Sequence, residues 1–212
     1  MGVKERRERE RLEIKEKILD AARELFVSQG YEGVSMRKVA EKIEYSPTAI
    51  YLHFADKQQL FRELCQADFA KLSQLFRSIA QLKDPVQRLI RIGHAYIDFG
   101  ARFPYHYQLM FMTRHPHVEG PDECDREVMG NPELDAYAFL KHTVQAAIEA
   151  GRFRQGVKDT ELISQTLWAA VHGVISLQIA KSDDYWVKWR PLEKRADLML
   201  QSVLRGMLRN GR

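Results

Sequence analysis

Small and hydrogen-bonding side chains gather between residues 46 and 57, in the stretch SPTAIYLHFADK. Ser46 followed by Pro47 is a strong helix start, because serine can cap the first turn and proline fits its first position. The next residues, Thr48 and Ala49, are small enough to approach base edges, and a threonine offers both a methyl and a hydroxyl group to a base. This stretch therefore predicts a short helix that can enter a DNA major groove.

Side chains that can bind phosphate surround this short helix. Tyr51 and His53 each carry a donor at the tip, and Lys57 lies in the first turn of the next predicted helix. A cation there opposes the helix dipole, and an anionic partner at the same place would explain it. The alternative is that Lys57 only points into water. Ser35 and Arg37, which begin the preceding predicted helix, coincide with this cluster.

Helical periodicity dominates the N-terminal part and predicts helices over about 4–29, 36–42, 47–53 and 56–81. The second and third are joined by a tight turn at Glu44-Tyr45, which is the layout of a helix-turn-helix. The first helix opens on a run of charges of both signs. This run is either a solvated extension or a basic arm that contacts DNA phosphates.

Bulk properties restrict the function less than the pattern does. The net charge is +4, and residues 1–57 hold 12 Lys and Arg against 11 Asp and Glu, so charge alone does not indicate nucleic acid. We expect neither a membrane span nor a secretory signal, since no run of about 18 apolar residues and no apolar N-terminal stretch occur. Cys65 and Cys124 stand apart and are expected to be reduced thiols in the cytoplasm.

Aromatic residues and methionines crowd the middle of the chain. Further helices are expected over about 85–102, 105–112, 132–151, 159–181 and 191–209, about nine in all, with a loop over 114–131. At helical spacing the aromatic stripe forms either plain core or an adaptable apolar ligand pocket. The predicted pocket residues are Phe99, Phe103, Met110, Phe111, Trp168 and His172.

The last two predicted helices have the pattern of an interface. Small residues on the first of these helices permit close approach of another helix, and apolar residues recur at intervals of three and four residues on the second. Two such helices from each subunit would form a four-helix bundle, although packing inside one subunit is the alternative. The predicted dimer residues are Leu162, Thr166, Ala169, Ala170, Gly173, Val174, Leu177, Met199, Val203 and Met207.

Four segments of the N-terminal part together resemble the DNA-binding domain of the TetR family of bacterial transcription regulators. They are Ile18 to Phe26 (ILDAARELF), Gly30-Tyr31, Ser35 to Ala40 and Ser46 to Lys57. The resemblance implies phosphate contacts and base readout, and it places Phe54 in the core. The implied phosphate contacts are Ser35, Arg37, Tyr51, His53 and Lys57, and the implied readout residues are Pro47, Thr48, Ala49 and Leu52. The family usually has glycine where this chain has Glu44, so a positive φ there would cost about 1 kcal/mol.

The C-terminal half resembles a subgroup of these regulators that is named for its Trp-x-x-x-His-Gly motif. The resemblance rests on Trp168, His172 and Gly173 and on the segment FPYHYQLMF upstream of them. This implies a C-terminal ligand-sensing and dimerising domain without naming the ligand. A lone histidine on such a face is also common in plain cores.

Other classes of protein fit less well. The sequence has no Gly-rich phosphate loop, nucleophile elbow or HExxH motif, so we expect no catalysis and no cofactor. His115, His117 and Cys124 could hold zinc but lack regular spacing, so no metal site is predicted. An architectural DNA protein would be far more basic.

The sequence thus predicts an all-α chain with a helix-turn-helix domain over 1–57 and a helical domain over 58–212. The expected partners are palindromic double-stranded DNA, a second copy and a small-molecule effector, with no membrane.

Overall fold

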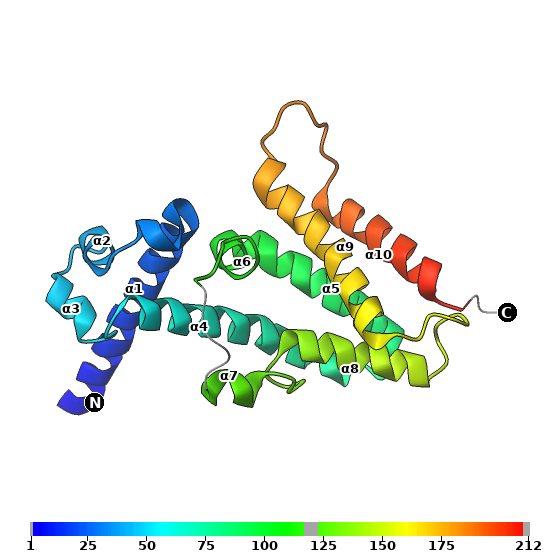
Figure 1. Ribbon diagram of the computed structural model, residues 1–212, viewed down its shortest axis with the longest axis horizontal. Coiled ribbons are helices and arrows are strands. Elements are labelled where there is room, and N and C mark those ends of the chain that lie inside the picture. Colours follow the sequence, from blue (N-terminus) through cyan, green and yellow to red (C-terminus); the bar gives the residue numbers. More distant parts are fainter. Residues whose placement is uncertain (1, 117–122, 210–212) are drawn as a thin grey trace. The chain divides into compact units, whose positions relative to one another are not determined.

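The computed structural model describes residues 2–116 and 123–209 (Figure 1). Over these residues the chain is almost entirely helical, with a single isolated bridge between Phe153 and Leu208 outside the helices. The α-helices are α1 (Val3–Gly33), α2 (Met36–Lys42), α3 (Pro47–Tyr51), α4 (Lys57–Arg77), α5 (Pro85–Arg102), α6 (Pro104–Phe111), α7 (Glu123–Val128), α8 (Ala136–Glu149), α9 (Thr160–Lys181) and α10 (Leu192–Met207). The predicted all-α fold is confirmed.

Several boundaries differ from the sequence-based expectations. The described residues hold ten α-helices where about nine were expected, because α7 lies in the segment predicted to be a loop. The fourth helix ends at Arg77 and a 3-10 turn covers Ser78–Gln81. Gly30 does take a left-handed φ of 69°, but helical structure resumes after this kink and reaches Gly33. The eighth helix begins at Ala136 and not at Pro132, because Asp135 caps it.

The chain divides into two compact units, which are described separately. The first comprises Met1–Asp68 and Tyr105–Glu119, and the second comprises Phe69–Pro104 and Gly120–Arg212. Segments α1 to α3, the beginning of α4 and most of α6 therefore belong to the first unit. The end of α4 with α5, α8, α9 and α10 forms most of the second.

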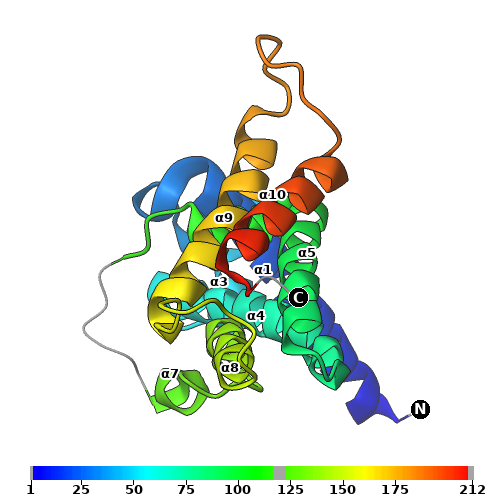
Figure 2. The same ribbon diagram turned by 90° about the vertical axis from the view of Figure 1, so that its right-hand side faces the viewer.

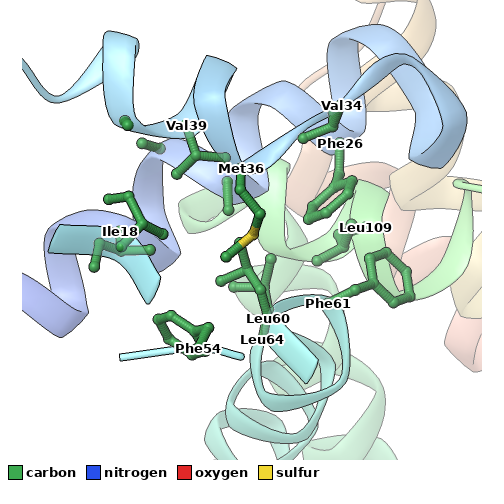
Figure 3. Packing of buried hydrophobic residues seen from close by; sticks show 14 residues of the cluster. Ile18, Phe26, Val34, Met36, Val39, Phe54, Leu60, Phe61, Leu64 and Leu109 are labelled. Carbon is green, nitrogen blue, oxygen red and sulfur yellow. The ribbon is translucent and has the colours of Figure 1, made fainter. Parts of the chain in front are cut away.

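The first unit is built around one apolar cluster (Figure 3). Ile18 and Phe26 of α1, Ile50 of α3 and Leu60 of α4 are all fully buried in it. Leu109 of α6 enters the same cluster and is also fully buried, although it is far away in sequence. Phe54 is buried as well, as the family resemblance implied. The short α3 is thus held in place by packing, since a helix of 5 residues is not stable by itself.

The second unit packs four helices on a shared core. Leu89, Ile92 and Tyr96 form part of the buried face of α5. Gly93 lies on the same face and admits α10, since a β-carbon at that position would come within 2.5 Å of Leu200. Figure 2 shows α9 and α10 side by side, joined by a long loop that projects away from both helices.

The turn between α2 and α3 carries backbone strain at Glu44, whose φ is 60°. A side chain costs about 1 kcal/mol in this left-handed region, whereas glycine adopts it freely. We therefore expect Glu44→Gly to raise the free energy of unfolding by up to about 1 kcal/mol in urea titrations. Glu41→Gly, at an ordinary helical position of α2, should lower it by a similar amount, because glycine is a poor helix former and the exposed pair with Arg37 adds little. Equal losses in both variants would contradict the strain.

Candidate nucleic-acid interface and effector region

The helix α3 presents its outer face to solvent while one side chain anchors it. Ile50 is fully buried, whereas Thr48 and Tyr51 are exposed and Leu52 is 73% exposed. A single exposed leucine is common on protein surfaces, but here it adjoins the exposed Thr48 and Tyr51 at the same short helix. The exposed row therefore has the shape and chemistry of a face that contacts another molecule.

Two serines fix the starts of the helices at this face. The Ser35 hydroxyl accepts a hydrogen bond from the backbone N–H of Lys38 at 3.3 Å, and the Ser46 hydroxyl accepts one from Ala49 at 3.2 Å. Both helices therefore begin at defined residues, with Pro47 in the first turn of α3. Each hydroxyl keeps its own hydrogen, which can be donated to an anion such as a phosphate.

Charged groups border the face on both sides. Arg37 is exposed and pairs with Glu41 at 2.8 Å, an arrangement that solvent screening weakens. His53 is half-buried, and its burial lowers the pKa of the imidazole below the ordinary value. The positive charges of Arg11 and Lys15 on α1 lower the pKa of His53 further. His53 is thus neutral at pH 7 in the free protein and lies near cations from another helix.

Lys57 has partners inside the protein. Its ammonium group donates a hydrogen bond to the carbonyl oxygen of Tyr31 at 3.0 Å and lies 4.2 Å from the centroid of the Tyr31 ring. The Glu32 carboxylate is 3.9 Å away and almost fully exposed. The cation that opposes the α4 dipole is therefore also a tie between α4 and the end of α1.

A polar and aromatic cluster joins α5 to α9 in the second unit. The Trp168 indole N–H donates to the Tyr96 hydroxyl at 2.9 Å, and that hydroxyl lies 3.5 Å from Nδ1 of His172. The Tyr137 ring lies 5.7 Å from the Trp168 ring. Burial lowers the pKa of His172, so the imidazole is neutral at pH 7. The cluster offers aromatic faces and uncharged hydrogen-bonding groups.

Aromatic rings continue this cluster along α5. Tyr96, Phe99 and Phe103 lie three and four residues apart and share one face of the helix. The Phe99 and Phe103 ring centroids are 5.5 Å apart, and the Lys71 ammonium lies 3.7 Å from the Phe103 centroid. The Phe103 ring at the C-terminal end of α5 thus already faces a cation.

Both the N-terminal and the C-terminal part of the chain match known protein families. Residues 18–64 match the family model described as bacterial regulatory proteins, tetR family, and residues 89–208 match a tetracyclin repressor-like C-terminal domain. The chain belongs to the tetR family. Its DNA-binding domain is the part that carries α2 and α3, and the resemblance seen in the sequence is confirmed. The subgroup named for the Trp-x-x-x-His-Gly motif stays a prediction.

Individual relatives of this TetR-family chain agree with that assignment. The HTH-type transcriptional repressor AcnR of Corynebacterium jeikeium is 30% identical over 77% of this chain and 80% of its own length. A TetR family transcription regulator from Marinobacter aquaeolei is 15% identical with a TM-score of 0.74, covering 97% of this chain and all of the other. A structure described as a SmeT–triclosan complex is 20% identical with a TM-score of 0.67, over 93% and 92% of the two chains.

The predicted DNA-contacting residues of the TetR-family domain come together in the first unit. They lie on α2, on α3 and next to the ends of these helices, except Lys57, which begins α4, and most are exposed. Their contacts with DNA stay predictions. Sequence reasoning missed the proximity of Arg11 and Lys15 to His53. The available signal was their helical spacing from the buried Ile18.

The six predicted pocket residues are divided between the units. Phe99, Phe103, Trp168 and His172 belong to the second, while Met110 and Phe111 belong to the first. Their role in ligand binding stays a prediction. Tyr96, whose hydroxyl contacts both α9 residues, was not among the predicted residues. Tyr96 belongs to the aromatic stripe of the sequence, but its spacing does not indicate which residues its hydroxyl contacts.

The described residues hold no cluster of three or more metal-binding side chains. His115 is used structurally, since its Nε2 lies 2.8 Å from the Leu109 carbonyl oxygen and its ring meets Phe61 edge-on. The zinc alternative also involved His117, which lies outside the described residues, and Cys124, whose side chain is likewise not described.

The helix α9 has an apolar face that nothing in its own unit covers. Leu162, Thr166, Ala169 and Leu177 are exposed, and a β-carbon added at Gly173 would meet no atom within 4 Å. By length and composition α9 could even cross a membrane, which the sequence analysis did not anticipate, and 28% of its apolar window is buried. One such helix is weak support for a membrane span, because the opposite face of α9 packs in the core of the unit.

Proposed function

We propose that this TetR-family protein is a homodimeric repressor that binds a palindromic operator and leaves it when an apolar or aromatic small molecule binds. The observation that carries the proposal is the exposed row on α3, held by Ile50 and by the Ser46 cap. The role is one of binding, with no catalytic step, and it places the protein in the cytoplasm with the DNA.

Base readout is assigned to α3 and phosphate contact to its surroundings. Thr48 near the start of α3 and Leu52 directly after its end are both exposed, where they can reach base edges in a major groove. Ser35, Arg37, Tyr51 and Lys57 carry donors that suit phosphate oxygens. Base contacts select a sequence, whereas phosphate contacts strengthen binding to all sequences and make it depend on salt.

This division of roles predicts opposite results for two substitutions. Lys57→Ala should weaken binding to all DNA sequences alike and reduce the slope of log affinity against log salt by about one per subunit. Thr48→Ala should instead change the preferred base at one position of each half-site and leave the slope unchanged. Fluorescence anisotropy over a salt series measures both quantities.

The control for this pair is stability, because Lys57 also holds the Tyr31 carbonyl. Unfolding curves of the Lys57→Ala variant must show that the protein is folded at the assay temperature. A changed sequence preference in Lys57→Ala with an intact salt slope would contradict the assigned roles.

The dimer is assigned to the apolar face of α9, together with α10. Between Glu161 and Lys181 the helix α9 carries no Asp, Glu, Lys or Arg. The exposed Leu162, Thr166, Ala169 and Leu177 lie on one side of it, with the half-buried Gly173 between them. On α10, Leu198 is 69% exposed, while Met199, Val203 and Met207 are half-buried. A two-fold axis through such a face covers it with the same face of a second copy. The two α3 helices of the dimer would then read a two-fold operator.

The effector is assigned to the cluster around Tyr96, Trp168 and His172. Its groups are aromatic or neutral at pH 7, so an apolar or aromatic molecule with a hydrogen-bonding group would match them. The SmeT–triclosan complex is an example of this fold with an aromatic ligand. The helix α4 begins in the first unit and ends in the second, so it is a covalent route for coupling.

Coupling between effector and operator is reciprocal, which makes it measurable. If the effector weakens operator binding tenfold, saturating operator must weaken effector binding tenfold, which corresponds to about 1.4 kcal/mol. We expect this shift when apolar and aromatic compounds are titrated against the fluorescence of Trp168. The other two tryptophans, the exposed Trp186 and the half-buried Trp189, can be replaced by phenylalanine to remove their background.

Trp168→Phe is the matched control, because it removes the indole N–H that donates to Tyr96. With Trp186 and Trp189 already replaced, it also removes the remaining tryptophan signal. Identical effector affinity with and without operator would refute the coupling, even if the compound binds. Failure of a broad ligand screen would favour the plain-core alternative for this cluster.

A further inference from the structure

Four basic residues follow one another on a single face of α1, before that helix enters the core. Their spacing of three, four and four residues keeps them on one side of the helix. We call this set the basic stripe, and it consists of Lys4, Arg7, Arg11 and Lys15. The same face continues with Ile18 and Ala22, which are fully buried in the core of the first unit. The face that packs on α2, α3 and α4 thus changes from apolar to basic where the core ends.

The neighbouring charges of α1 are arranged differently. Arg6 pairs with Glu10 at 2.8 Å and Arg9 approaches Glu13 at 3.8 Å, both on the opposite side of the helix. Arg7 and Arg11 make no ion pair within the part of the chain that the structure describes. Glu8 is the acidic residue that falls within the arc of the basic stripe. The two arginines of the basic stripe therefore lack ion pairs among the described residues, whereas the two arginines on the opposite side approach glutamates.

The C-terminal end of the basic stripe, at Lys15, lies beside Phe54, which follows α3 in the sequence. The Lys15 ammonium lies 5.6 Å from the centroid of the Phe54 ring and 2.6 Å from a Glu63 carboxylate oxygen. Arg11 and Lys15 are close enough to lower the pKa of His53, which directly follows Leu52. From there α1 extends beyond the α2–α3 pair (Figure 1). At 1.5 Å per residue, the stripe reaches about 17 Å from Lys15 to Lys4.

Like charges three and four residues apart destabilise an isolated helix. A stripe of this kind is stabilised by a polyanion that lies along it, and the row begins where α3 would leave the groove. We propose that the basic stripe binds the phosphate backbone of double-stranded DNA that flanks the base pairs read by α3. This inference rests on the proposed function as a DNA-binding regulator and extends its footprint beyond the helix-turn-helix.

The test compares two double variants with the same change in charge. Arg7→Gln/Arg11→Gln removes the centre of the basic stripe, and Arg6→Gln/Arg9→Gln removes the same charge from the opposite side of the same helix. Each protein is titrated over a salt series with two duplexes. One carries the selected operator with about one helical turn of flanking sequence at each end, and the other is trimmed to the half-sites.

On the long duplex the stripe variant should lose at least tenfold in affinity at about 0.1 M salt. Its salt slope should fall by up to about 0.9 for each lost contact, with four arginines removed per dimer. The control variant should remain within about twofold of the unsubstituted protein. On the trimmed duplex the stripe variant and the unsubstituted protein should converge, and base preference should be unchanged throughout.

Equal losses in the two double variants would overturn the proposal, because they would reflect net charge and not the stripe. Unchanged affinity of the stripe variant on the long duplex would overturn it as well, while leaving the proposed function intact. If the unsubstituted protein bound no DNA in any selection, the proposed function would fail and the stripe proposal with it. Circular dichroism should show that all variants fold, since all four arginines are exposed.

Discussion

Arginine in place of Gly173 is expected to leave the subunit folded and to abolish the dimer. A β-carbon at Gly173 meets no atom within 4 Å, so the subunit has room for the new side chain. Arginine is also a better helix former than glycine. In the proposed dimer the same residue lies in the middle of the α9 face, where an unpaired charge costs several kcal/mol of association. Sedimentation should show a monomer that has lost specific operator binding.

The matched control adds the same charge elsewhere in the second unit. Gln87 is exposed on α5, away from the α9 face, and Gln87→Arg should sediment as the unsubstituted dimer. Gly173 is a sharper choice than Val203, because Val203 is half-buried within its own unit and arginine there would disturb the subunit too. A Gly173→Arg protein that remains a tight dimer would contradict the proposed interface.

Loss of the Asp68 carboxylate is expected to destabilise the first unit by about 3–5 kcal/mol. Arg23 of α1 is 6% exposed and Asp68 of α4 is 1% exposed. Two parallel hydrogen bonds join them, from Nε to Oδ2 at 2.9 Å and from Nη2 to Oδ1 at 2.8 Å. Asp68→Ala would leave the guanidinium buried without its main partner. The free energy of unfolding in urea should fall accordingly.

Asp20 gives the control for this pair, because it contacts the same arginine at 2.6 Å but is 72% exposed. Asp20→Ala should cost between about 0 and 1 kcal/mol. The double variant Arg23→Met/Asp68→Leu should recover most of the stability, since two apolar side chains can replace a buried ion pair. Similar losses for Asp20→Ala and Asp68→Ala would contradict the dominant role of burial.

The sequence was most informative where short-range chemistry decides the structure. The dipeptides Ser46-Pro47 and Asp84-Pro85 predict helix starts, and both helices begin at the proline. The family resemblance left open whether the turn at Glu44 differs or tolerates a positive φ, and the structure has a φ of 60° there. The helix α7 was missed because its surroundings are rich in proline and glycine, which favour a loop in any local reading.

Contacts between distant segments could not be predicted in the same way. The Trp168–Tyr96 hydrogen bond joins residues 72 positions apart, and the Arg23–Asp68 pair joins residues 45 apart. Their formation depends on how two helices cross, which periodicity does not specify. Likewise, the tie from Lys57 to the Tyr31 carbonyl depends on how α1 ends after its kink at Gly30.

Selection of DNA from a random pool by the unsubstituted protein tests the central claim most directly. A dimer that presents two α3 helices should enrich a site with two-fold symmetry. Its half-sites should be centred about 34–36 Å apart, or close to a multiple of that distance. The same selection with Thr48→Ala should keep the symmetry and the spacing while changing the preferred base in both half-sites. An enriched site without two-fold symmetry, or no enrichment over the starting pool, would contradict a dimeric regulator that reads DNA through α3.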